Sequence, residues 1–219
     1  MSDAEIDAWG ARCRAHLAAQ PGADAAHDLA HSARVVAWAE RLARDEGADR
    51  AVVVPAAWLH DAVHVPKTHP DRASASRLAA DAARGWLAAE GYPADRLDAV
   101  AHAIEAHSYT AGVPPETAEA RVVQDADRLD ALGAVGIARC YAMSGVFGSA
   151  LAHPTDPVPS EPPGRELDDR RWATDHFFVK LLGLPATMRT AAGRAEAERR
   201  AAFMRAFLDR LRRESGAVR

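Results

Sequence analysis

Histidines and aspartates recur in this chain at positions where the apolar face of a helix is expected. Val35, Trp38 and Leu42 are spaced three or four residues apart and define one such face. His31 lies four residues before Val35 and therefore shares that face. A histidine in this position is either an ordinary core residue with satisfied hydrogen bonds or a ligand of a metal ion.

Two carboxylates have apolar neighbours, although charged positions also interrupt the helix around Asp127. His60-Asp61 ends the run AAWLHD (56–61), and Asp127 lies in QDADRLDALGAVGIAR (124–139). A buried carboxylate without a partner is very costly, so each requires a cation, an arginine or a metal. Imidazoles and carboxylates together suit divalent Mn, Mg, Fe, Co or Zn. No HExxH pair is present, so any site must collect ligands from separate helices. Spacing alone leaves the metal site and ordinary core or ion-paired residues both open.

Helical periodicity explains most of the chain, and runs of β-branched residues are rare. Ser2 and Glu5 form a capping box, Gly47 ends a helix, and Asp49 and Thr190 cap later ones. The expected helices are 2–20, 27–46, one from 49 that carries LHDAV (59–63) at its end, 71–90, 93–107, 117–144, 172–183 and 190–214. The fold class is therefore all-α.

Prolines predict two departures from this regular pattern. Pro55 lacks an N–H and its ring clashes with the preceding turn, which predicts a kink or an early break unless the helix begins near it. Residues 145–170 hold five prolines and three glycines and predict a long Pro-rich loop. Such a loop is a candidate lid over a site.

Composition narrows the class of protein. The 219 residues are 48% hydrophobic, which suits one domain over 1–219 with a real core. The net charge of −4 and the lack of a basic block argue against a dedicated nucleic-acid surface. Two separated cysteines, Cys13 and Cys140, do not form a disulfide framework and fit a reducing cytoplasm. We expect no signal peptide and no membrane span.

The residues in question resemble a known family. His31, the His60-Asp61 doublet and the distant Asp127, in this order and on separate helices, resemble the HD-domain superfamily of metal-dependent phosphohydrolases. The chain is also similar to a bacterial subgroup of small HD hydrolases at VPKTHPDRASAS (65–76), HAIEAHSYTAG (102–112) and DHFFVKLLGLPATMRTAAGRAEAERRAAFM (175–204). The resemblance covers about residues 25–210 and implies a single HD-domain helical bundle.

The resemblance also implies roles for individual residues. His31, His60, Asp61 and Asp127 would bind one divalent metal, which would lower the pKa of a water molecule and polarise a phosphoryl group. Phosphate carries spread negative charge, so cationic side chains should contact it. Lys67, Arg128 and His107 are the candidates for these catalytic contacts, and each has an ordinary structural alternative. The remaining candidates, for which packing, capping or second-metal roles compete, are His27, His64, His102, Glu105, Asp130, His176 and Lys180.

Three functions compete at this stage. The first is a phosphohydrolase acting on a small phosphorylated molecule, above all a nucleotide. The second is an HD hydrolase of another phosphate ester, such as a cyclic dinucleotide or a sugar phosphate. The third is a helical binding or sensory module whose metal is only structural and fully coordinated by protein.

Overall fold

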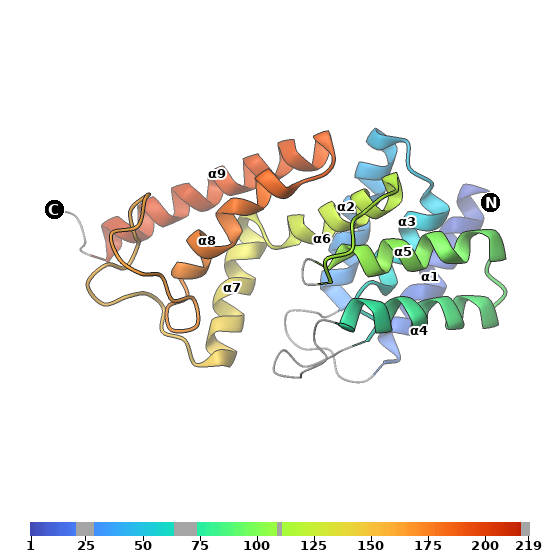
Figure 1. Ribbon diagram of the computed structural model, residues 1–219, viewed down its shortest axis with the longest axis horizontal. Helices are drawn as coiled ribbons and strands as arrows, with labels where there is room; N and C mark the ends of the chain where they lie inside the picture. Colours follow the sequence, from blue (N-terminus) through green and yellow to red (C-terminus); the bar gives the residue numbers. More distant parts are fainter. Residues whose placement is uncertain (21–28, 64–73, 109–110, 216–219) are drawn as a thin grey trace. The chain divides into compact units, whose positions relative to one another are not determined.

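The structure is a computed structural model that describes residues 1–20, 29–63, 74–108 and 111–215. Contacts within the chain divide it into two compact units, Met1–Asp127 and Arg128–Arg219. Figure 1 shows that both units are built from helices. In the described parts of the chain the one β-type contact is an isolated bridge between Ala150 and Trp172, so the all-α prediction is confirmed.

The first unit is organised around one apolar helix. Its elements are α1 (Asp3–Ala18), α2 (Leu29–Glu46), α3 (Arg50–Leu59), α4 (Ala75–Ala89), the short 3-10 helix η2 (Ala94–Arg96), α5 (Leu97–His107) and most of α6 (Ala118–Asp130). Residues 51–59 of α3 are all buried, and α3 packs against α1, α2 and α5. Burial on every side explains why α3 carries no polar stripe. The helix therefore delivers His60 and Asp61 from the centre of the unit.

The predicted helix caps are confirmed. The Ser2 hydroxyl accepts a hydrogen bond from the Glu5 amide, and the Glu5 carboxylate accepts one from the Ser2 amide. The Asp49 carboxylate accepts from the Ala51 amide at 2.8 Å. Gly47 has a φ of +67°, the left-handed conformation that ends a helix.

Pro55 lies inside α3 and does not end it, so the expected early break is wrong. In a regular helix the amide of residue 55 would donate to the carbonyl of Ala51, and proline has no amide proton. The buried Tyr92 hydroxyl donates to that Ala51 carbonyl instead. A side chain from outside the helix thus replaces the missing hydrogen bond.

The second unit begins with a sharp turn that the sequence did not predict. The expected single helix 117–144 is wrong: α6 ends at Asp130 and α7 spans Gly133–Phe147. Gly133 has a φ of +72°, and a Cβ at Gly136 would lie 2.2 Å from the Ala131 carbonyl oxygen. Both glycines are therefore required by the turn.

The rest of the second unit consists of α8 (Asp175–Val179), the 3-10 helix η3 (Leu181–Thr187) and α9 (Ala191–Glu214), which packs against α7 and η3. Thr190 caps α9 as predicted, because its hydroxyl accepts from the Gly193 amide at 3.0 Å. The expected helix 172–183 begins later, at Asp175, and changes to 3-10 geometry after Lys180. We call residues 148–174 the α7–α8 segment; no helix interrupts it. In the described parts of the chain, no helix is long and apolar enough to cross a membrane.

Candidate metal centre

The first unit brings together the four residues predicted to bind a metal. His31 lies in the first turn of α2, His60 caps the C-terminus of α3, Asp61 follows it, and Asp127 lies in α6. The shortest separations between their side chains are 3.3 Å from His31 Nε2 to His60 Nε2, 3.4 Å from His31 Nε2 to Asp127 Oδ1, and 3.5 Å from His60 Nε2 to Asp61 Oδ2. Three helices and one adjoining residue therefore supply one cluster.

These separations fit ligands that share one ion. Two ligand atoms that each lie about 2.1 Å from a metal are about 3.0 Å apart at 90° and about 3.4 Å apart at the tetrahedral angle. The wider separations are 3.8 Å, from His60 Nε2 to Asp127 Oδ1, and 3.9 Å, from His31 Nε2 to Asp61 Oδ2. His31, His60 and Asp127 form one group able to hold an ion, and His60, Asp61 and His107 form a second.

His60 is oriented by a backbone hydrogen bond. Its Nδ1 lies 2.8 Å from the carbonyl oxygen of Ala57. A carbonyl only accepts, so Nδ1 carries the proton and the neutral ring presents the lone pair of Nε2 to the cluster. This is the arrangement expected of a metal-binding histidine whose other nitrogen is held by the protein.

His107 lies beside the four predicted ligands. It is the last residue of α5 and is buried, and its Nε2 is 3.7 Å from Asp61 Oδ1. Its Nδ1 lies 2.6 Å from the Ile104 carbonyl, so its Nε2 also faces the cluster. The position suits either a further metal ligand or a contact to substrate.

The pKa values of His60 and Asp127 are shifted in the direction that binding a cation requires, whereas the pKa of His107 is raised. Burial alone would lower the pKa of His107, but the hydrogen bond and charge of Asp61 outweigh it. Burial lowers the pKa of His60 to about 4, so the ring is neutral near pH 7. Burial alone would raise the pKa of Asp127, but the His31 hydrogen bond and the neighbouring imidazoles outweigh it and hold that pKa below its usual range. Neutral imidazoles and ionised carboxylates are the forms that a divalent metal requires.

One side of the cluster is more accessible than the other. The side chains of His31 and His60 are 1% and 0% exposed, whereas those of Asp61 and Asp127 are 27% and 29% exposed. Access from solvent is therefore through the carboxylates.

The sequence did not single out Gln124, which helps to hold the site together. Its side-chain amide donates to the carbonyl of Ala106 at 2.7 Å, a bond that joins α6 to the end of α5 beside His107. Gln124 is buried and lies three residues before Asp127. A polar residue on the buried face of α6 was the available signal.

Other candidates lie elsewhere. Lys67, His64 and His27 fall outside the described residues. In the second unit the buried Arg128 donates to the Thr187 carbonyl at 2.7 Å, at the end of η3. The other candidates form pairs or lie at a surface: Asp130 with Arg139, Glu105 with Arg77, His102 with the Glu116 amide, His176 with Asp169, and Lys180 exposed after α8. These contacts suit structural roles.

Comparison with known proteins agrees with this geometry. A model of the HD domain matches residues 28–132, a range that contains the whole cluster. The chain is 34% identical over 192 residues to the Bacillus subtilis protein YpgQ, covering 86% of this chain and 84% of YpgQ. The chain belongs to the HD-domain superfamily.

Solved structures of individual relatives extend the match over almost the whole chain. The structure of Bacillus subtilis YpgQ in complex with ADP has a TM-score of 0.70 at 31% identity and covers 94% of this chain and 97% of that one. An HD-superfamily hydrolase from Bacillus thuringiensis has a TM-score of 0.71 at 30% identity, with 98% of each chain covered.

Proposed function

We propose that this protein is a metal-dependent phosphohydrolase that hydrolyses a phosphate ester or anhydride of a nucleotide. The observation that carries the proposal is the cluster of His31, His60, Asp61 and Asp127, supplied by α2, by the C-terminal end of α3 and by α6 in an HD-domain fold. Nucleotide is the favoured class of substrate because the similar protein YpgQ was crystallised with ADP.

The donor set fits a divalent cation. Two imidazoles and two carboxylates suit Mn, Mg, Fe, Co or Zn, and leave part of a coordination sphere for other ligands. When bound, the metal would supply Lewis-acid polarisation of the phosphoryl group and an acidified water. The two carboxylates would partly neutralise the bound cation, and without it they would repel a phosphate.

The role of His107 follows from where its side chain lies. His107 can face a substrate only through Nε2, because its Nδ1 is bound to the Ile104 carbonyl. We assign His107 to contact with the phosphoryl group or its leaving oxygen. Lys67 and Arg128 remain proposed phosphate-binding cations.

The alternatives make different predictions. A purely structural metal would be enclosed by protein ligands, whereas Asp61 and Asp127 are more than a quarter exposed. That exposure favours an enzyme over a binding module. An HD hydrolase of a non-nucleotide phosphate ester would share the same centre and differ only in the substrates it accepts.

The test is a substrate panel with matched variants. The protein is stripped of metal, reloaded with Mn²⁺, and assayed with nucleoside mono-, di- and triphosphates and with p-nitrophenyl phosphate. We expect metal-dependent hydrolysis of a nucleotide that is lost in Asp61→Asn and kept in Asp81→Asn, which alters an exposed carboxylate of α4. Hydrolysis that does not depend on added metal, or that persists in Asp61→Asn, would refute the proposed metal-dependent enzyme. Stoichiometric metal binding without hydrolysis would indicate instead a binding module with a structural metal.

A further inference from the structure

The α7–α8 segment is closed at its base. The Ala150 amide donates to the Arg171 carbonyl at 2.9 Å, and the Ala173 amide donates to the Ala150 carbonyl at 2.9 Å. The Ser149 hydroxyl donates to the Arg170 carbonyl at 2.7 Å. Residues 149–151 and 170–174 therefore lie side by side and enclose residues 152–169, as the ends of a compact loop do.

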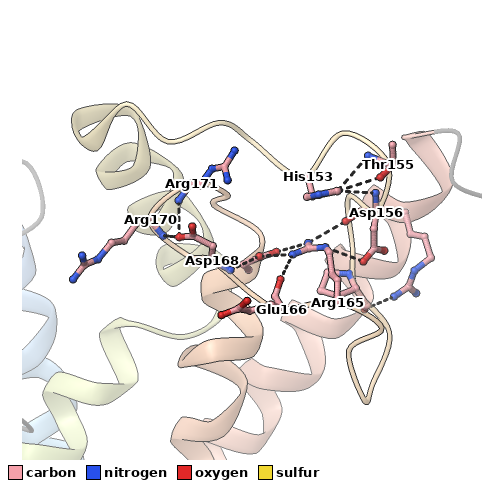
Figure 2. A network of polar contacts seen from close by, with 11 residues as sticks. His153, Thr155, Asp156, Arg165, Glu166, Asp168, Arg170 and Arg171 are labelled. Carbon is pink, nitrogen blue, oxygen red and sulfur yellow. Dashed lines mark hydrogen bonds and ion pairs between the residues drawn. The ribbon is translucent and has the colours of Figure 1, made fainter.

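Arg165 lies inside this loop, with all of its donors engaged (Figure 2). Nε donates to the Asp156 carboxylate at 3.1 Å, and Nη2 donates to the Asp156 carbonyl at 3.2 Å. Nη1 and Nη2 form a bidentate pair with the Asp175 carboxylate at 2.7 and 2.6 Å, and Nη1 also donates to the Glu166 carbonyl at 3.1 Å. A guanidinium has five N–H donors, so none is left for a phosphate.

The partner of this guanidinium is a buried carboxylate. The Asp175 side chain is 0% exposed and that of Arg165 is 18% exposed. Asp175 also accepts from the Asp168 amide at 2.8 Å. Because an ionised carboxylate without a partner is very costly in such a position, the first residue of α8 requires Arg165.

The far side of the loop is fixed around Asp156. The Asp156 amide donates to Nδ1 of His153 at 3.3 Å, and the His153 ring packs edge-on against Trp172 at 5.2 Å between centroids. Trp172 belongs to the closed base of the loop. Arg165 thus links Asp156, in the first half of the loop, to Asp175, the first residue of α8 just after the loop.

Two further contacts between this segment and α9 are weaker. Arg205 pairs with Glu161, and both side chains are about half exposed. Arg212 donates to the Pro159 carbonyl at 3.3 Å. Exposed ion pairs contribute little to stability, so these contacts cannot replace the Arg165 network.

We propose that Arg165 is the residue that folds the α7–α8 segment, so that residues 149–174 open and close as one cooperative unit while the helices stay folded. Lysine cannot take its place, since it is a point charge without the planar fork that binds two carboxylates and two carbonyls together. This role is independent of the proposed hydrolase activity.

Hydrogen exchange on the full-length protein, followed by mass spectrometry, tests the proposal with a matched pair of substitutions. Arg165→Lys keeps the charge and removes the fork, and we expect exchange of amides in 149–174 to accelerate by at least about tenfold. Peptides from α2, α3 and α5 should be unchanged. Arg170→Lys changes an exposed arginine of the same segment and should leave all rates unchanged.

The outcome decides the matter even if Arg165→Lys does not fold. Asp156→Asn removes one charged acceptor and leaves the Asp175 pair, and we expect a smaller acceleration confined to the same residues. An Arg165→Lys protein that exchanges like Arg170→Lys would overturn the proposal. So would acceleration spread evenly over all helices, or an insoluble Arg165→Lys together with an unaltered Asp156→Asn.

Discussion

Replacing Tyr92 by phenylalanine removes one hydroxyl whose partner is known. That hydroxyl donates to the Ala51 carbonyl, the acceptor that Pro55 leaves without its helical donor. The ring itself can stay in place, edge-on to Trp9 at 4.8 Å between centroids. The substitution therefore tests one hydrogen bond inside the helix that delivers the His60-Asp61 doublet.

The expected cost follows from burial. Tyr92 is 4% exposed and Ala51 is 1% exposed, so the carbonyl that Tyr92→Phe leaves behind is largely shielded from water. Leaving such a group without a hydrogen bond costs about 1–3 kcal/mol. In a Pro55→Ala background the amide of residue 55 can donate to Ala51, and the same change should cost less than about 0.5 kcal/mol. The coupling between positions 55 and 92 is then about 0.5–3 kcal/mol.

Urea unfolding of the parent protein, both single variants and the double variant measures this coupling. Tyr141→Phe is the control, because the buried Tyr141 hydroxyl has no hydrogen-bond partner among the described residues, and its loss should cost nothing. An equal penalty for Tyr92→Phe in both backgrounds would refute the reasoning. So would a Tyr141→Phe protein destabilised as much as Tyr92→Phe.

Three further predictions concern the metal centre and the turn between α6 and α7. Asp127→Asn should weaken Mn²⁺ binding, measured by calorimetry, by about 100-fold or more, because a charged ligand is lost. The control variant Asp81→Asn should bind Mn²⁺ as tightly as the parent protein does. Equal affinities of the two variants would exclude Asp127 as a ligand. Adding EDTA to the Mn²⁺-loaded protein should lower the melting temperature, because the ion binds only the folded state, and it should have little effect on Asp127→Asn; an equal shift in both proteins would contradict this. Gly136→Ala should lower the free energy of unfolding by about 3 kcal/mol or more, because its Cβ would lie 2.2 Å from the Ala131 carbonyl oxygen. Gly85→Ala in α4 is the control: a Cβ there would have no contacting atom within 4 Å, and the substitution should raise the free energy of unfolding by about 0.5–1 kcal/mol. A Gly136→Ala protein as stable as the parent would mean that the turn does not need this glycine.

Local sequence marked the residues of the cluster as unusual, and the resemblance to the HD-domain superfamily grouped them as one set. A histidine on an apolar face and carboxylates in apolar sequence violate the usual polar pattern, and satisfying them requires one another or a cation. The caps at Ser2 and Asp49 are local in the same way, since side chain and amide are two or three residues apart. Neither inference needed the arrangement of distant elements.

The features that escaped prediction depend on long-range or conformational facts. Gly133 and Gly136 look like tolerated helical glycines until the backbone turns at Ala131. Tyr92 lies 41 residues from Ala51, so the sequence near Pro55 does not indicate that the Tyr92 hydroxyl replaces the missing amide donor. Arg165 lies in a segment without periodicity, and its pairing with Asp175 is visible only once the loop closes.

Two helices end at the metal centre in the same manner, and this shapes what the centre can bind. His60 follows α3 and His107 ends α5, and each donates its Nδ1 proton to the carbonyl three residues before it. Each bond is made to a carbonyl in the last turn of its helix, and it fixes the ring so that Nε2 faces the cluster. The C-terminal ends of helices carry partial negative charge, and Asp61 and Asp127 add two full charges. A centre built in this way attracts cations and repels phosphate. Under the proposed function, an anionic substrate would therefore occupy it only together with a divalent ion, and the metal would be a condition of substrate binding as well as of the chemistry.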